Sequence, residues 1–160
     1  MAADPAPKAA TVPVKGWFED FEVGRHYPTR TRVITGADHE AFCRLVGYEV
    51  PLFLDDAYAR TRGLPGRICP SHLIMSFSTA MTGDLFTDTV IAMTALDNAR
   101  FLAPVRPSDG LRTEAEVLAK RAGSKPDRGT VVFRDHVYNQ RNEEVFRNDK
   151  TVLLKRRPRV

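Results

Sequence analysis

The chain has 160 residues, with 42% hydrophobic and 28% charged residues, which predicts one ordinary soluble globular domain with a single core. Its formal net charge is +4, and much of it lies in the closing segment KRRPRV, without aromatic residues interleaved among the basic ones. We therefore expect no nucleic-acid site. No apolar run approaches the ~18 residues of a membrane span, so we expect no membrane association.

The first 15 residues, MAADPAPKAATVPVK, predict a loose, partly extended tail ahead of a domain over residues 16–158. This segment lacks the basic start and apolar stretch of a secretory signal. Cys43 and Cys69 are too few for a disulfide framework, and we expect them to be buried free thiols. The four histidines are scattered, so their spacing predicts no metal site. The expected compartment is the cytoplasm.

Short elements fill the next part of the chain. Residues 16–24, GWFEDFEVG, predict an extended segment or turn that caps a core, and residues 27–35 predict a strand. A short helix follows, which Thr35 or Asp38 would cap and Gly47 would end. Asp38 and His39 form a tempting pair, but capping and exposure explain them better than chemistry. The expected apolar face of this helix is formed by Ala41, Phe42, Leu45 and Val46.

Two further helices are predicted before the chain changes character. One begins in residues 51–63, where Asp55 and Asp56 favour a helix start and Gly63 a stop. The other covers SHLIMSFSTAMTGDLF, residues 71–86, with Ser71 in the N-cap position after Pro70. This segment is apolar over most of its circumference, which is typical of a buried helix.

The second half predicts four strands, residues 89–105, 111–123, 129–140 and 143–157, separated by turn-rich segments. Within the second of them, apolar or small residues alternate with charged ones from Leu111 to Lys120, as in a strand with one buried face. A helix as apolar as residues 71–86 needs cover on several sides. A curved antiparallel sheet wrapped around one long central helix supplies it, in an α+β architecture.

Four stretches carry a resemblance to a known family. They are FEDFEVGRHYPTRTRVITGADHEAF, LVGYEVPLFLDDAYA, GRICPSHL and NARFLAPVRPSDGLRTEAEVLAKR. Together they resemble the MaoC-like dehydratase family, which includes the (R)-specific enoyl-CoA hydratases, from about Phe18 to Arg157. The resemblance implies a single hotdog fold and a homodimer or larger assembly that binds acyl-CoA or another acyl thioester between subunits. It implies no cofactor, because coenzyme A enters only as part of the substrate.

In active relatives, an aspartate and a histidine of the second stretch hold the water that is added or removed, and a backbone N–H at the start of the long helix holds the thioester oxygen. Here Tyr48 stands at the aspartate, Val50 at a neighbouring asparagine and Phe53 at the histidine, whereas Gly47 and Asp55 match. Phenylalanine transfers no proton, and an unperturbed tyrosine titrates near pH ~10. A conventional hydration is therefore hard to support, because acid–base catalysis needs a titratable group in reach.

The third stretch departs as well, with Ser71 at the family's histidine and His72 at its glycine. The backbone N–H survives this change, so an oxyanion site at the helix start is still expected. His72 is either a relocated acid or base, oriented by Ser71, or a helix-start residue bonded to nearby backbone. Glu49 either supplies a carboxylate or faces solvent. The hydroxyl of Tyr48 either faces the substrate or the ring only fills the pocket.

The resemblance, taken with these replacements, implies an acyl-CoA hydratase or dehydratase, a lyase, with a rearranged site that accepts an unusual or already polar acyl group. His72, Tyr48 and Glu49 are the expected catalytic residues, and Ser71, Val50, Phe53 and Arg100 the expected substrate-binding ones. Arg100 and Arg106 could meet the phosphates of coenzyme A or simply flank a strand. The alternative is a non-catalytic acyl-CoA-binding or partner subunit. A thioesterase-like hydrolase has less support, because Asp84 lies in a helix-end context.

Overall fold

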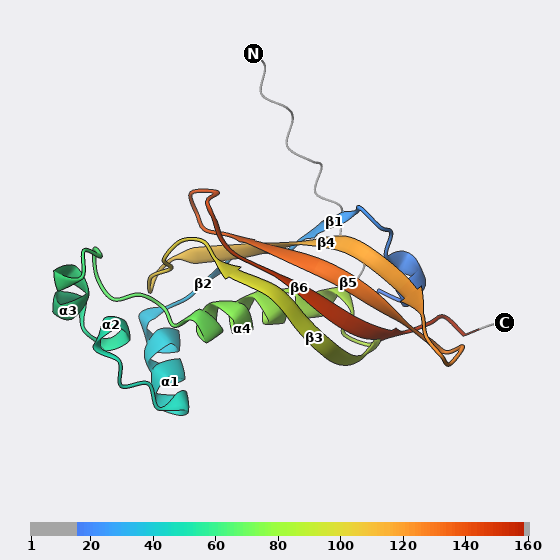
Figure 1. Cartoon of the computed structure of the whole chain (residues 1–160), viewed down its shortest axis with the longest axis horizontal. Coiled ribbons are helices and arrows are strands. Elements are labelled where there is room, and N and C mark those ends of the chain that lie inside the picture. The colour runs from blue at the N-terminus through green and yellow to red at the C-terminus, as the bar shows by residue number, and fades with distance from the viewer. Residues whose placement is uncertain (1–15, 159–160) are drawn as a thin grey trace, which may run out of the picture.

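The computed structural model describes residues 16–158, so the predicted tail over residues 1–15 lies outside it. The elements in chain order are the 3-10 helix η1 (Phe18–Asp20), β1 (His26–Pro28), β2 (Arg32–Val33), α1 (Gly36–Val46), α2 (Pro51–Leu54), α3 (Asp56–Thr61), α4 (Ser71–Thr82), the 3-10 helix η2 (Gly83–Leu85), β3 (Val90–Phe101), β4 (Gly110–Ala122), β5 (Arg128–Tyr138) and β6 (Glu144–Lys155). The short strands β1 and β2 come before α1, and the four long strands follow the last of the helices (Figure 1).

The strands form one antiparallel sheet in the order β1-β4-β5-β6-β3, and β2 pairs with β4. The four long strands confirm the four predicted from the second half of the sequence. On β4, the side chains of Leu111, Thr113, Ala115 and Val117 are buried, whereas the charged residues between them are partly exposed. The alternation predicted from the sequence is therefore confirmed from Leu111 to Val117, where it turns the apolar face of β4 toward the core. Beyond Val117 the prediction is wrong, because a register shift between Val117 and Ala119 interrupts the strand and Ala119 is exposed.

Aromatic side chains fill the part of the core beneath β4 and β5. The Phe21 ring is fully buried and meets the rings of Tyr27, Phe86 and Phe133 at centroid distances of 5.3, 6.5 and 5.1 Å. The prediction that residues 16–24 cap a core is thus confirmed, with Phe21 as the inserted side chain. Edge-to-face pairs of this kind add to the stability that burial of the rings provides.

Helix α4 lies along one face of the sheet, and α1, α2 and α3 gather at the end where α4 begins (Figure 1). Leu73, Ile74 and Phe77 are buried, as expected for the most apolar helix. However, the predicted cover on several sides is only partial, because His72, Ser76 and Ala80 are exposed. These three residues recur every four positions and therefore share one face of the helix. The sheet does not close around that face within one chain.

A buried polar network joins α4 to the sheet. Lys150 Nζ lies 2.7 Å from Asp135 Oδ2 and also donates to the hydroxyl of Thr82, and Ser78 Oγ donates to Asp135 Oδ2 over 3.3 Å. Asp135 and Lys150 are 0% and 1% exposed. Burial raises the pKa of Asp135 and lowers the pKa of Lys150, and each charge opposes the shift of the other. The buried apolar residues form two clusters, one that includes Phe133 and one that includes Phe146.

Local capping explains the short helices. The Thr35 hydroxyl accepts a hydrogen bond from the Asp38 N–H over 3.0 Å, so Thr35 is the N-cap of α1. Gly47 ends α1 with φ of 73°, a left-handed conformation that glycine adopts without a steric penalty. The single helix expected over residues 51–63 is wrong. It is two helices, because Asp55 adopts extended backbone after Pro51–Leu54 and its side chain caps α3.

Cys43 and Cys69 are buried free thiols, as predicted. Among the described residues no helix is long and apolar enough to cross a membrane. Within residues 16–158, no group of three or more His, Cys, Asp or Glu side chains is placed to hold a metal ion.

Candidate functional site

The first turn of α4 borders a hollow of about 260 Å³. Pro70, not Ser71, is the N-cap, so the predicted cap is wrong: the Pro70 carbonyl accepts from the Leu73 N–H over 3.0 Å, and Ser71 is already helical. The N–H groups of Ser71 and His72 lie in the first turn of α4, where no helical carbonyl precedes them by four residues. They therefore lack a hydrogen-bond partner within the helix. The hollow is lined by Ile68, Cys69, Ser71, Ile74, Phe101, Leu102, Ala103, Pro104 and Val105.

The His72 side chain is exposed on this first turn. Its carbonyl accepts a hydrogen bond from Ser76 Oγ over 2.7 Å. None of the hydrogen bonds between described residues joins the His72 imidazole to Ser71, which lines the hollow beside it. The imidazole is thus free to meet a ligand that approaches the helix start.

An aromatic wall follows α1. The ring of Tyr48 meets that of Phe53 edge to face at 5.2 Å between centroids, and that of Phe42 at 6.4 Å. Tyr48 and Phe53 are partly buried. The two positions where the family resemblance leads us to expect a water-binding pair therefore face each other, but here they are filled by two rings in contact.

His39 holds this wall in place from behind. Its side chain is fully buried, which contradicts the expected exposure, and its Nε2 lies 2.6 Å from the carbonyl oxygen of Phe53. The carbonyl is the acceptor, so Nε2 carries the proton. Helix α1 thereby fastens α2, although the two are separated by the turn around Tyr48. The sequence offered no signal for this contact, because it joins residues 14 positions apart across that turn.

The other predicted site residues are spread around this region. Glu49 and Val50 are exposed between α1 and α2. Arg100 is exposed on β3, where its guanidinium donates to the Ala99 carbonyl over 2.8 Å. Asp84 is exposed at the far end of α4 and lies 3.7 Å from Arg30, in agreement with a helix-end position. The structure therefore brings Tyr48 and Phe53 into contact and leaves Arg100 on another element.

A groove of about 350 Å³ runs between α1 and the exposed face of α4. It is mostly apolar and is lined by Arg32, Asp38, Ala41, Phe42, Leu45, Leu73, Ser76, Phe77 and Ala80. Phe42 belongs both to the aromatic wall and to this groove. The helical period predicted the apolar character of α1, but its buried side chains are His39 and Cys43. Leu45, by contrast, is 82% exposed.

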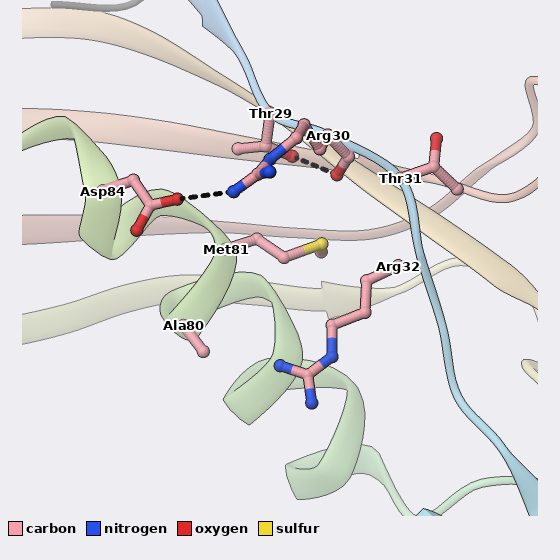
Figure 2. Close-up of a pocket in the computed structure, with 7 residues that line it drawn as sticks. All are labelled: Thr29, Arg30, Thr31, Arg32, Ala80, Met81 and Asp84. Atoms are coloured by element: carbon pink, nitrogen blue, oxygen red, sulfur yellow. Dashed lines mark hydrogen bonds and ion pairs between the residues drawn. The ribbon is translucent and has the colours of Figure 1, made fainter. Parts of the chain in front are cut away.

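A second hollow of about 340 Å³ continues the groove along α4 (Figure 2). Arg32 and Ala80 line both, and Met81 lies between the two arginines Arg30 and Arg32 in Figure 2. Arg32 is the residue that sequence analysis missed. Its guanidinium carbon lies 4.8 Å from the centroid of the Phe77 ring, and the chain between them gives no periodic signal for that contact.

Cys69 and Asp38 line these hollows, and the pKa values of their side chains are shifted in opposite directions. Burial raises the pKa of Cys69 to about 12, so its thiol stays protonated at neutral pH and is a poor nucleophile. The hydroxyl and N–H of Thr35 lower the pKa of Asp38, which therefore stays a carboxylate. His72 carries the exposed imidazole of α4. An imidazole in this position can transfer a proton, and the N–H groups at the start of the helix can polarise a carbonyl group.

Residues 20–137 match the family model described as the MaoC like domain, which is well over half of the chain. The chain belongs to the MaoC-like domain family. The predicted family resemblance is thereby confirmed.

Two curated relatives illustrate the range of this MaoC-like family. The chain is 28% identical over 143 residues to the uncharacterized protein YdeM of Bacillus subtilis, with 87% of this chain and 99% of YdeM covered. It is 30% identical over 151 residues to mesaconyl-CoA hydratase of Cereibacter sphaeroides, with 88% of this chain covered but only 41% of the hydratase. The chain thus spans nearly all of one relative and less than half of the other.

Solved structures confirm the hotdog fold of this MaoC-like chain. A putative MaoC domain protein dehydratase from Chloroflexus aurantiacus matches with a TM-score of 0.86 and 27% identity, over 94% of this chain and 43% of that one. The R-hydratase PhaJ1 from Pseudomonas aeruginosa matches with a TM-score of 0.74 and 26% identity, over 89% of this chain and 88% of that one. A Mycobacterium tuberculosis protein with a double hotdog fold matches with a TM-score of 0.83 and 22% identity, over 91% of this chain and 46% of that one. At this identity the match supports a shared fold and nothing more.

Proposed function

We propose that this MaoC-like protein is an acyl-thioester hydratase or dehydratase. In this proposal its acid–base chemistry is carried out at the start of α4 and not by residues 45–59, where the family resemblance leads us to expect it. His72 is the acid or base, and Tyr48 and Glu49 assist it. The N–H groups of Ser71 and His72 polarise the thioester carbonyl. The observation that supports this proposal best is the exposed imidazole of His72 beside two N–H groups that lack an intrahelical acceptor.

The substrate class in this proposal is an acyl-CoA, and coenzyme A is part of the substrate rather than a cofactor. Two relatives, a mesaconyl-CoA hydratase and an R-hydratase, support this class. The groove between α1 and α4 offers apolar side chains for the acyl group. In this proposal Val50 and Phe53 also contact the acyl group, and Arg100 binds the coenzyme. The free thiols Cys43 and Cys69 fit a reducing compartment such as the cytoplasm.

The active form in this proposal is a homodimer that pairs through β3. Among the strands of residues 16–158, β3 ends the sheet and pairs only with β6, so its other edge presents backbone groups to which no described strand bonds. Ile91, Met93 and Leu96 on this strand are 40%, 44% and 38% exposed. A second copy of the chain would cover these side chains and extend the sheet, as a two-fold interface allows.

The alternative is a binding or partner subunit of the same fold without catalysis. The contact between the Tyr48 and Phe53 rings favours it, because these rings occupy the space that a catalytic pair and its water would need. A thioesterase-like hydrolase has less support, because Asp84 is paired with Arg30 at the far end of α4.

Mass spectrometry of a panel of acyl- and enoyl-CoA thioesters incubated with the protein separates these functions. Gain or loss of one water on the acyl group, reduced at least about 100-fold in His72→Ala, supports the lyase. His26→Ala is the matched control, because His26 is an exposed histidine on β1 that contacts Glu114 on the outer face. Release of free coenzyme A would indicate the thioesterase. Binding without turnover, unchanged in His72→Ala, would contradict both enzymes and support the partner subunit.

A further inference from the structure

Arg32 lies at the junction of the groove and the second hollow. It is on β2, beside β4, and its side chain extends toward α4 (Figure 2). The guanidinium carbon is 4.8 Å from the centroid of Phe77, whose ring is only 8% exposed and belongs to the core. A buried ring cannot move freely, so it gives the guanidinium a fixed platform, and the cation–π contact holds it there.

Stacking on a ring face leaves the N–H donors of arginine free, because they point outward in the guanidinium plane. The hydrogen bonds and ion pairs between residues 16–158 include none made by the Arg32 guanidinium, whereas Arg30 faces Asp84 and Arg134 binds Asp149 through two N–H groups. Arg32 is therefore a positioned cation whose fork of donors is open toward the two hollows.

The carboxylate of Asp38 lies near Arg32 but forms no hydrogen bond or ion pair with its guanidinium among the contacts of residues 16–158. Asp38 also lines the groove, but its carboxylate accepts the Thr35 N–H over 3.0 Å and the Thr35 hydroxyl over 2.8 Å. It is thereby held at the N-terminus of α1, where the helix dipole favours a negative charge. The charge of Asp38 acts on Arg32 only at longer range.

The rest of the groove suits methylene groups, because Ala41, Phe42, Leu45 and Leu73 supply apolar walls. Phe77 follows His72 by five residues, so the platform of Arg32 lies about 7.5 Å farther along the axis of α4. A short acyl group that lies in this groove and runs along α4 from its first turn would have its distal end at the level of Arg32. A carboxylate at that end matches the planar fork of an arginine in shape and charge.

We propose that Arg32 is a specificity-determining residue that binds the distal carboxylate of a dicarboxylic acyl group held as a CoA thioester in the groove between α1 and α4. This inference rests on the proposed function, because it assumes that an acyl thioester occupies the groove. It specifies that the unusual or polar acyl group expected from the sequence is a short dicarboxylic acyl group.

Isothermal titration of the full chain with glutaryl-CoA and pentanoyl-CoA tests this inference without requiring turnover. The two saturated thioesters have acyl chains of the same carbon number and differ by the distal carboxylate. We expect the wild type to prefer glutaryl-CoA about tenfold, and Arg32→Gln to bring the ratio close to one. Arg32→Lys should keep part of the preference, because it keeps the charge but loses the fork. Arg44→Gln, a change at an exposed arginine of α1 outside both hollows, should keep all of it.

Each contrary result has a distinct meaning. Equal affinities of the wild type for the two thioesters overturn this inference alone. An equal loss of affinity for both in Arg32→Gln, with the ratio kept, also overturns it, because Arg32 would then bind a phosphate of coenzyme A. Failure of both thioesters to bind the wild type overturns the inference and the proposed function together. Far-ultraviolet circular dichroism and a thermal melt establish that the variants compared are folded.

Discussion

The rings of Tyr48 and Phe53 meet edge to face, 5.2 Å apart between centroids, at the two positions where the family resemblance leads us to expect an acid–base pair. The two side chains belong to the turn after α1 and to α2, and the hydrogen bond from His39 to the Phe53 carbonyl fixes one against the other. The backbone thus still holds these positions face to face. Two aromatic rings therefore occupy the positions where the resemblance leads us to expect groups that hold water.

The double variant Tyr48→Asp, Phe53→His should therefore gain activity. We expect it to hydrate crotonyl-CoA about 100-fold faster than the wild type, because a positioned acid–base pair contributes at least that factor. The loss of absorbance of the enoyl thioester measures the rate. The aromatic pair contributes about 1 kcal/mol of stability beyond its burial, so the variant should unfold at a somewhat lower temperature.

Tyr48→Asp alone is the matched control and should gain little, because the histidine is missing. A double variant that melts cooperatively and binds crotonyl-CoA but hydrates it no faster than the wild type would contradict this prediction. It would mean that these positions no longer face the reacting carbons of the substrate.

The sequence predicted the strands well because their signal is local. Alternation from Leu111 to Val117 indicates which side of β4 is buried, whatever lies on the other side of the core. No signal in the sequence marks the register shift after Val117, which leaves Ala119 exposed. Capping also follows from short-range contacts, as between Thr35 and Asp38. The break at Asp55 was missed, because acidic residues favour the start of a helix without showing that another helix has just ended.

The site was less predictable because its contacts join distant elements. The burial of His39 depends on α2 folding back over α1, and the position of Arg32 depends on β2 lying beside α4. Periodicity in one helix or strand carries no information on either contact. The residue types of the aromatic wall were visible in the sequence, but the contact between Tyr48 and Phe53 could be seen only in the structure.

The edge strand β3 gives a prediction on assembly. Met93→Lys together with Leu96→Lys should convert the proposed homodimer to a monomer, because two charges on an apolar edge disfavour pairing with another strand. Size-exclusion chromatography with light scattering should show a fall from twice the chain mass to the chain mass. Val23→Lys, a change at a residue that is 62% exposed and lies outside the long strands, should leave the dimer intact. A dimer that survives the β3 variant would place the interface elsewhere.

The buried pair of Asp135 and Lys150 gives a prediction on stability. Lys150→Met should lower the free energy of unfolding by about 3–5 kcal/mol, because it leaves the Asp135 carboxylate buried without its cation. The double variant Lys150→Met, Asp135→Leu should recover a large part of that loss, since no buried charge remains to be compensated. Urea unfolding measures both. If the loss in the double variant equalled the sum of the losses in Lys150→Met and in Asp135→Leu alone, the two residues would act independently.

Asp149 and Arg134 give a prediction on pH dependence. Arg134 Nε and Nη2 donate to the two carboxylate oxygens of Asp149 over 2.7 and 3.0 Å, and these hydrogen bonds lower the pKa of Asp149. A carboxyl group whose pKa is lower in the folded protein than in the unfolded chain stabilises the fold above its unfolded pKa of about 4. That contribution is lost as the pH falls from about 4 through the lower pKa of the folded state.

Asp149→Asn should therefore weaken the acid dependence of stability. Below pH about 4, the free energy of unfolding of the wild type should fall more steeply with decreasing pH than that of the variant. We expect a difference of about 1 kcal/mol in total, because the side chain of Arg134 is 34% exposed and water screens the pair. Arg134→Gln should flatten the same range by another route, since it returns the pKa of Asp149 toward its ordinary value. If urea titrations between pH 2 and 5 gave one slope for all three proteins, the pair would not contribute to acid unfolding.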